Sequence, residues 1–121
     1  MRNGALRDKS YQFAVRIVNM HKFLTEDKRE FIISKQVLRS GTAIGALVME
    51  AVQAQSRADF ISKLSIALKE ASETSYWLNL LKESQLINQK SYDSMQHDCE
   101  ELLKMLTASI KTAKKNRLEK E

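Results

Sequence analysis

The chain has 121 residues, which is enough for one domain and too few for two. It lacks proline, has three glycines and is 43 % apolar, a composition that favours long helices around one core. No stretch approaches the ~18 uninterrupted apolar residues of a membrane span, the first residues lack the apolar run of a secretory signal, and the single cysteine excludes an intrachain disulfide. We therefore expect a soluble cytoplasmic protein with no membrane partner.

Helical periodicity divides the chain into four segments. The predicted helices cover residues 8–24, 27–55, 58–84 and 89–115, and residues 116–121 are predicted to be a frayed basic tail. The breaks between the segments are short, and short connections favour antiparallel neighbours. The sequence thus predicts an all-α fold, an antiparallel up-down-up-down four-helix bundle that forms a single domain.

Local capping signals mark the start of three of these helices. Asp27 followed by Glu30 matches the spacing of a capping box, with aspartate in the position that Ser or Thr usually takes. Ser56 followed by Asp59 gives a capping signal for the third helix, and Asn88 is predicted to be the N-cap of the fourth. These signals support the predicted starts of the second, third and fourth helices.

The second predicted helix is apolar on two faces, which indicates burial on two sides. Gly41 and Gly45 lie inside it, and each costs about 1 kcal/mol relative to alanine in a helix interior. The close approach of a neighbouring backbone would compensate for this cost, whereas a kink near residues 40–42 is the alternative. We expect the two glycines to mark a close contact between helices.

One apolar stripe per helix supplies the predicted core. On the fourth helix the stripe recurs at alternating steps of three and four residues, as in a coiled coil. The residues that we predict to be buried are Ile17, Val37, Ile44, Leu64, Leu68, Leu78, Leu102 and Leu106. Cys99 lies in the same stripe as a small apolar residue, and His21 is predicted to lie in the core or at its boundary.

Four-helix bundles raise the question of a di-metal centre, which needs a Glu-x-x-His motif on each of two helices and a Glu on each of the others. Glu70 and Glu73 have the spacing of such a motif, but no histidine follows them, and no glutamate precedes His97 by three places. The adjacent residues His97, Asp98 and Cys99 point in different directions on a helix, so they are not a ligand set. The chain also lacks a P-loop, a glycine-rich dinucleotide turn and a nucleophile elbow. We therefore expect no metal, no other cofactor and no enzymatic activity.

Positive charge is concentrated at both ends of the sequence. Residues 1–40 hold nine Lys/Arg against four Asp/Glu, and residues 109–121 hold five against two. The residues between them hold six against nine, so the middle of the chain is mildly acidic. This asymmetry favours a polyanionic partner such as RNA or DNA, although many solvated surfaces carry similar runs of charge.

Three groups of cations are the candidate nucleic-acid-binding residues. They are Lys28, Lys35 and Arg39 on the second helix, Lys9 and Arg16 on the first, and Lys111, Lys114, Lys115 and Arg117 near the C-terminus. Arg39 is equally suited to pair with a carboxylate such as Glu50 or Glu70, and cations near a helix C-terminus also complement the helix dipole. No aromatic residue is interleaved with these cations, so we expect phosphate contacts instead of base stacking.

Two stretches of the predicted second and third helices carry a family resemblance. They run from Gln36 to Gly45, continuing to Glu50 and Ala51, and from Asp59 to Leu78. Over residues 10–114 the chain resembles the bacterial four-helix-bundle family of 23S rRNA intervening-sequence proteins, a group that includes the accessory variability determinant of diversity-generating retroelements. One departure is visible, since Leu47 stands where the family often has asparagine, and any polar role of that residue is absent here.

The resemblance implies an antiparallel four-helix bundle that assembles into a homopentameric barrel. It also implies a basic surface that, in the retroelement branch, contacts nucleic acid and a reverse transcriptase, whereas the ribosomal branch has no settled biochemical activity. The leading hypothesis is therefore a non-enzymatic oligomeric protein associated with RNA or DNA. The alternative is a structural adaptor that binds a protein partner such as a reverse transcriptase without touching nucleic acid.

Apolar side chains that exceed the needs of one bundle point to self-association. The residues that we expect in the subunit contact are Leu38, Gly45, Ile66, Trp77 and Leu80. Together they would make an apolar patch larger than most soluble monomers expose, and tryptophan is favoured at interface centres. The alternative is that part of this surplus is absorbed within the subunit, because a helix in a bundle has two neighbours. That alternative suits Leu38 better than Trp77.

Overall fold

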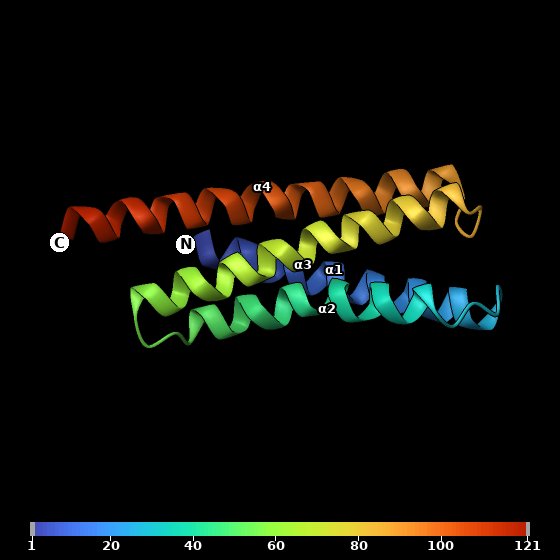
Figure 1. Ribbon diagram of the computed structural model, residues 1–121, viewed down its shortest axis with the longest axis horizontal. Helices are drawn as coiled ribbons and strands as arrows, with labels where there is room; N and C mark the ends of the chain where they lie inside the picture. Colours follow the sequence, from blue (N-terminus) through green and yellow to red (C-terminus); the bar gives the residue numbers. More distant parts are fainter. Residues whose placement is uncertain (1, 121) are drawn as a thin grey trace.

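Each apolar stripe of the sequence forms a helix in the computed structural model, which describes the backbone of residues 2–120 and the side chains of residues 4–116. The helices are α1 (Arg2–Glu26), α2 (Ile33–Val52), α3 (Arg57–Glu83) and α4 (Gln89–Lys120). They run up and down in turn, and each contacts its neighbour in the sequence (Figure 1). Helix α4 returns to contact α1, and this contact, the smallest of the four, closes the bundle. The predicted four-helix bundle is confirmed.

The connection between α1 and α2 corrects the predicted start of the second helix. The prediction placed that start near Asp27, but α2 begins at Ile33. The chain turns at Arg29, whose φ is 54°, and the Glu30 carboxylate then takes over the capping role. It accepts hydrogen bonds of 2.7–3.1 Å from the backbone N–H groups of Ile32, Ile33 and Ser34. Burial raises the pKa of Glu30, but these donors outweigh burial and leave the pKa below its ordinary value.

The capping predictions for the third and fourth helices are confirmed. The Ser56 hydroxyl accepts a hydrogen bond of 3.0 Å from the backbone N–H of Asp59, and its own backbone is extended. The side-chain oxygen of Asn88 accepts one of 2.8 Å from the N–H of Ser91. Each bond satisfies a donor that has no partner inside its helix.

Three further helix ends differ from their predicted positions by about three residues or more. Helix α1 begins at Arg2 instead of residue 8, because Leu6 extends the apolar stripe and is buried. Helix α2 ends at Val52 instead of residue 55, because the chain must turn before the Ser56 cap. Helix α4 continues to Lys120, so residues 116–120 are helical and not a frayed tail. No glycine or proline interrupts that stretch, and most of its residue types favour a helix.

The core lies along the axis between the four helices. Seven of the eight residues predicted to be buried are buried, whereas Leu68 is half-buried and packs against the edge of the core. Helix α3 turns Ala67 and Ala71 to the centre instead, and both are fully buried. Because Ala67 and Ala71 take the central positions on this part of α3, Leu68 is left at the boundary. Among the described helices, none combines the length and apolarity needed to cross a lipid bilayer.

Helix α2 is one uninterrupted helix through Gly41 and Gly45, and both glycines face α1. A Cβ atom added at Gly45 would lie 3.2 Å from the backbone oxygen of Ser10. One added at Gly41 would lie 2.7 Å from the Cγ1 atom of Ile17. The prediction of a close helix contact is confirmed. Glycine occupies these two positions because any larger side chain would collide with α1.

Candidate functional site

Two of the predicted nucleic-acid-binding cations, Lys9 and Arg16, form ion pairs between α1 and α4. The Lys9 Nζ atom lies 2.6 Å from Glu101 Oε1 and 3.5 Å from Asp98 Oδ1. The Arg16 guanidinium lies 2.6 Å from Asp98 Oδ2 and also donates to the Ser94 hydroxyl at 2.8 Å. The hydrogen bond to Glu101, followed by the charge of Asp98, outweighs burial and raises the pKa of Lys9. Lys9 and Arg16 therefore link α1 to α4, the two neighbouring helices that pack least extensively against each other.

Arg39 forms a second ion-pair group, between α2 and α3. Its guanidinium lies 3.2 Å from Glu70 Oε1 and also contacts the carboxylate of Glu73. The Trp77 indole N–H donates to the same Glu73 carboxylate at 2.9 Å. The Trp77 hydrogen bond and the Arg39 contact together outweigh burial and hold the pKa of Glu73 below its ordinary value. Of the two roles considered for Arg39, the structure supports pairing with a carboxylate.

The prediction that Lys28, Lys35 and Arg39 form one stripe on the second helix is wrong. Helix α2 begins at Ile33, so Lys28 lies in the preceding connection, where its Nζ atom is 5.8 Å from the centroid of the Phe23 ring. Lys35 is exposed on α2, while Arg39 is engaged by α3. The prediction fails because Lys28 precedes the turn at Arg29 and so does not share the helical periodicity of Lys35 and Arg39.

The C-terminal lysines are also exposed, like Lys28 and Lys35. Lys111, Lys114 and Lys115 form no ion pair with any described side chain, and Arg117 lies outside the residues whose side chains are described. Lys104 was missed by the sequence analysis, although it is equally exposed and shares a face of α4 with Lys111 and Lys115. We call Lys104, Lys111, Lys114 and Lys115 the lysine face.

The lysine face also has a distinctive sequence context. No Asp or Glu occurs between Glu101 and Glu119, and this acid-free stretch is the signal that could have identified Lys104. The C-terminal end of α4 extends beyond both the N-terminus of α1 and the connection between α2 and α3 (Figure 1). The end of α4 is therefore open to a large partner.

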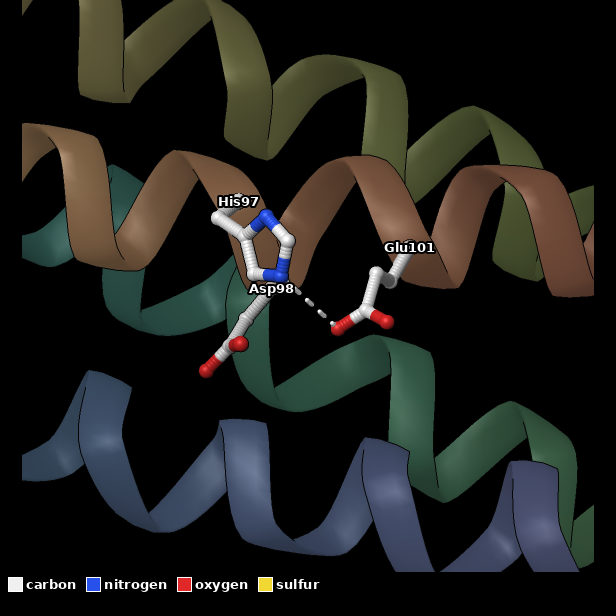
Figure 2. A group of neighbouring side chains, drawn as sticks. All are labelled: His97, Asp98 and Glu101. Atoms are coloured by element: carbon white, nitrogen blue, oxygen red, sulfur yellow. Dashed lines mark ion pairs between the residues drawn. The ribbon is translucent and has the colours of Figure 1, made fainter.

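A group of potential metal ligands lies on α4, where the sequence analysis expected none. His97, Asp98 and Glu101 place one ligand atom each within 4.8 Å of the others, and Figure 2 shows all three side chains projecting from the same helix. His97 Nε2 lies 3.4 Å from Glu101 Oε1. Both carboxylates, however, already contact Lys9 or Arg16 of α1. A metal ion would have to displace these cations, so the arrangement suits an ion-pair network better than a metal centre.

Cys99 and His21 have the positions that the sequence predicts. Cys99 is fully buried, and its thiol donates to the backbone oxygen of Ala71 at 3.3 Å. Burial, followed by the charge of Glu100, raises the pKa of the Cys99 thiol to about 12. A thiol with so high a pKa is a poor nucleophile at neutral pH, so Cys99 has a packing role. His21 is half-buried at the core boundary.

The residues predicted for a subunit contact have different surroundings. Leu38 and Trp77 are half-buried and pack against the core of their own subunit, and Leu80 is also half-buried. Gly45 faces Ser10 of α1, so the close helix contact inside the subunit already accounts for it. Ile66 is 41 % exposed, which leaves its side chain accessible to a partner.

A second exposed apolar row, on α1, was missed by the sequence analysis. Tyr11 is 71 % exposed, and Val15 and Val18 follow it on the same helix face. Tyr76 on α3 is also exposed. The spacing of the α1 residues, at steps of four and three, is the signal that could have revealed this row.

Comparison with known proteins places the chain in a family. The family model of the 23S rRNA-intervening sequence protein matches residues 3–108. The chain is also similar to a solved crystal structure, that of a protein with unknown function from the S23 ribosomal protein family of Bacteroides thetaiotaomicron VPI-5482. The two sequences are 56 % identical, and the structures superpose with a TM-score of 0.91. The match covers 92 % of this chain and 99 % of that chain. A comparison with curated proteins finds no match. This chain therefore belongs to the family of 23S rRNA-intervening sequence proteins.

Proposed function

We propose that this protein is a non-enzymatic, self-assembling protein that binds nucleic acid through the lysine face of α4. The observation that carries the proposal is the exposure of these four lysines in a stretch without any carboxylate between Glu101 and Glu119. Polyanions bind such a surface through their phosphates and release counterions as they do so. Contacts of this kind carry little sequence preference.

The helix dipole alone does not account for the lysine face. Cations are favoured near a helix C-terminus, but the effect falls off within about the last turn. Lys104 and Lys111 lie more than two turns before Lys120, where α4 ends. The names of the family and of the solved relative refer to 23S rRNA and to ribosomal proteins, which supports RNA as the polyanion.

Replacing Lys104, Lys111 and Lys115 by glutamine is expected to weaken binding of duplex RNA and to flatten its salt dependence. The slope of log K against log salt should fall by about one for each lysine that contacts a phosphate. Fluorescence anisotropy of a labelled duplex over a series of salt concentrations measures both quantities. The matched control replaces the exposed residues Lys22, Lys35 and Lys69 by glutamine, which removes the same charge elsewhere. Equal losses in the two triple variants would show that binding follows net charge and not the lysine face.

The self-association that we propose rests on two exposed apolar regions. One is the α1 row of Tyr11, Val15 and Val18, and the other contains Ile66 and Tyr76 on α3. The backbones of α1 and α3 are not adjacent within the described bundle, so the two regions lie on helices at opposite corners. When two different patches on one subunit pair with each other, the contact is heterologous and generates a ring if the rotation closes.

An Ile66→Glu variant is expected to lower the mass of the assembly, because a buried carboxylate without a partner disfavours the contact. Sedimentation at micromolar concentration should give the parent a mass well above that of one chain. Thr107→Glu is the matched control, since it adds the same charge at an exposed position of α4, which carries neither apolar region. A monomeric parent would refute self-assembly, and an unchanged Ile66→Glu assembly would remove Ile66 from the contact.

The competing function is that of an adaptor which binds a protein partner and no nucleic acid. The exposed α1 row favours it, because apolar side chains of this size commonly mark protein contacts. A partner recovered with the tagged protein after nuclease treatment, together with no retention of RNA at low salt, would replace the nucleic-acid proposal by this one.

A further inference from the structure

A pocket opens at the end of the bundle opposite the C-terminus of α4. It has a volume of about 420 Å³ and brings the end of α1 and the α1–α2 connection together with the α3–α4 connection. Both connections lie at the same end of the molecule in Figure 1. The lining side chains that matter chemically are Phe23, Lys28, Lys82, Gln85, Asn88 and Gln89, and we call this site the turn-end pocket.

The turn-end pocket combines an aromatic ring with two cations. Phe23 is 40 % exposed, which is unusual for a phenylalanine, and Lys28 Nζ lies 5.8 Å from the centroid of its ring. Lys82 Nζ lies 4.9 Å from the centroid of Tyr92 and 3.5 Å from the carboxylate of Glu83. Both ammonium groups therefore have only weak, solvent-exposed attractions, which an incoming phosphate could replace.

Three side-chain amides complete the lining. Asn88 uses its oxygen to cap α4 at 2.8 Å, so its amide nitrogen is free to donate to a ligand. Gln89 uses its nitrogen in a hydrogen bond of 2.8 Å to Asp93, so its oxygen is free to accept. Gln85 is exposed on a left-handed turn with φ 62°. The pocket thus offers a donor and an acceptor whose positions are fixed by α4, as recognition of a nucleobase edge requires.

A second aromatic–cation pair lies in the α1–α2 connection, outside the residues that line the pocket. Phe31 is 55 % exposed, and the Arg29 guanidinium carbon lies 5.5 Å from its ring centroid. The sequence predicts no aromatic residue among the cations, whereas in the structure the turn at Arg29 places Lys28 beside Phe23 and Arg29 beside Phe31. Exposed rings with neighbouring cations are the pattern by which proteins bind unpaired bases, through stacking and phosphate contact together.

We propose that the turn-end pocket binds a nucleotide of single-stranded nucleic acid, a proposal that rests on the nucleic-acid association proposed above. One base stacks on Phe23, with its edge toward Asn88 and Gln89, and a neighbouring base stacks on Phe31. Lys28, Lys82 and Arg29 take up the phosphates. The lysine face begins near the middle of α4 and runs toward its C-terminus, away from the pocket, so it contacts the backbone of a separate segment.

The lining favours a nucleotide over the other partners that a basic apolar surface attracts. An anionic lipid surface would engage Phe31, the exposed Ile32 and the cations, but it would leave the amides of Asn88 and Gln89 without a role. A duplex presents its phosphates but keeps its base faces stacked, so Phe23 and Phe31 would contribute nothing to its binding. The preference for single strands is therefore the property to test.

The test compares a short labelled single-stranded RNA with the duplex of the same sequence, by fluorescence anisotropy, on the full-length protein. Replacing Phe23 and Phe31 together by leucine keeps most of the apolar packing and removes both rings. We expect the affinity for the single strand to fall by about 5-fold to 100-fold, in line with the loss of one or two stacked bases, and the affinity for the duplex to stay unchanged. The variant with Lys104, Lys111 and Lys115 replaced by glutamine should weaken binding of both the single strand and the duplex. Phe31→Leu alone is a second variant for the same measurement. Phe31 lies in the connection between α1 and α2, so its replacement should not disturb the packing of the helices.

Tryptophan fluorescence reports binding at the pocket itself. The chain has one tryptophan, Trp77. In a variant that combines Trp77→Phe with Phe23→Trp, the only indole lies in the pocket, and a base that stacks on it should quench its fluorescence. Quenching by the single strand but not by the duplex supports the proposal. Equal losses for both RNA forms, no quenching, or binding of anionic vesicles that alone depends on Phe23 and Phe31 would overturn it. If the parent binds RNA only through the lysine face, the proposed function stands and this inference falls, whereas a parent that binds neither form ends both.

Discussion

A Leu102→Ala variant is expected to lose about 2–5 kcal/mol of unfolding free energy, because truncation of a buried leucine removes its transfer free energy and leaves a cavity. Leu102 is fully buried, and it follows Cys99 and precedes Leu106 along the α4 stripe, both of which are also fully buried. A domain of this kind is stable by about 5–15 kcal/mol, so the loss is a large part of the total. Urea unfolding followed by helicity, at one fixed protein concentration, measures the change.

Met49→Ala is the control for this prediction, because it shortens an apolar side chain of α2 that is 46 % exposed and lies outside the core. Its effect should stay within about 0.5 kcal/mol, as for most surface substitutions. A loss of less than half a kilocalorie for Leu102→Ala, or equal losses for the two variants, would mean that α4 does not turn this stripe toward the core.

The fold could be predicted from the sequence because its determinants are local and periodic. The stripes of α1 to α4 recur at helical spacing, and the caps at Ser56 and Asn88 use side chains within three residues of the bonds they make. The start of α2 could not be predicted in this way. Asp27 and Glu30 match the spacing of a capping box, but the Glu30 carboxylate caps α2 alone after a turn at Arg29. A left-handed residue that is not glycine leaves no signal in composition or periodicity.

The charged surface was harder to predict, because the partner of a cation lies on another helix. The sequence shows that Lys9, Arg16 and Arg39 are basic, but not that α3 and α4 bring carboxylates within ion-pair distance of them. The acid-free stretch of the sequence suggests that Lys104 belongs with the C-terminal lysines, but its exposure depends on how α4 is oriented in the bundle. Phe23 and Lys28 likewise come together through the end of α1. The classes of residue were visible in the sequence, whereas their pairing depends on how the helices meet.

A Gly41→Leu variant is expected to lose at least about 1–3 kcal/mol of unfolding free energy, the usual cost of extra carbon atoms in a well-packed core. A Cβ atom at this position would lie 2.7–2.9 Å from three carbon atoms of Ile17, well inside the ~3.5–4.0 Å at which carbon atoms attract. Ile17 is fully buried, so its side chain has no solvent-facing position to occupy instead. Leucine adds three more carbon atoms, so α1 and α2 must separate to admit it. Thermal and urea unfolding of the variant measure the loss.

Two further substitutions distinguish a steric cost from any general intolerance of change at glycine. Gly4→Ala should keep or slightly raise the stability, because a Cβ atom there has no neighbour within 4 Å and alanine favours the helix. Gly41→Ala should be destabilising in the parent but less so when Ile17 is also replaced by alanine, since the smaller side chain removes the clash. A double-mutant cycle then gives a favourable coupling between the two positions. If Gly41→Leu unfolds like the parent, or if the cycle shows no coupling, α1 and α2 do not approach each other at Gly41 and the glycine has no packing role.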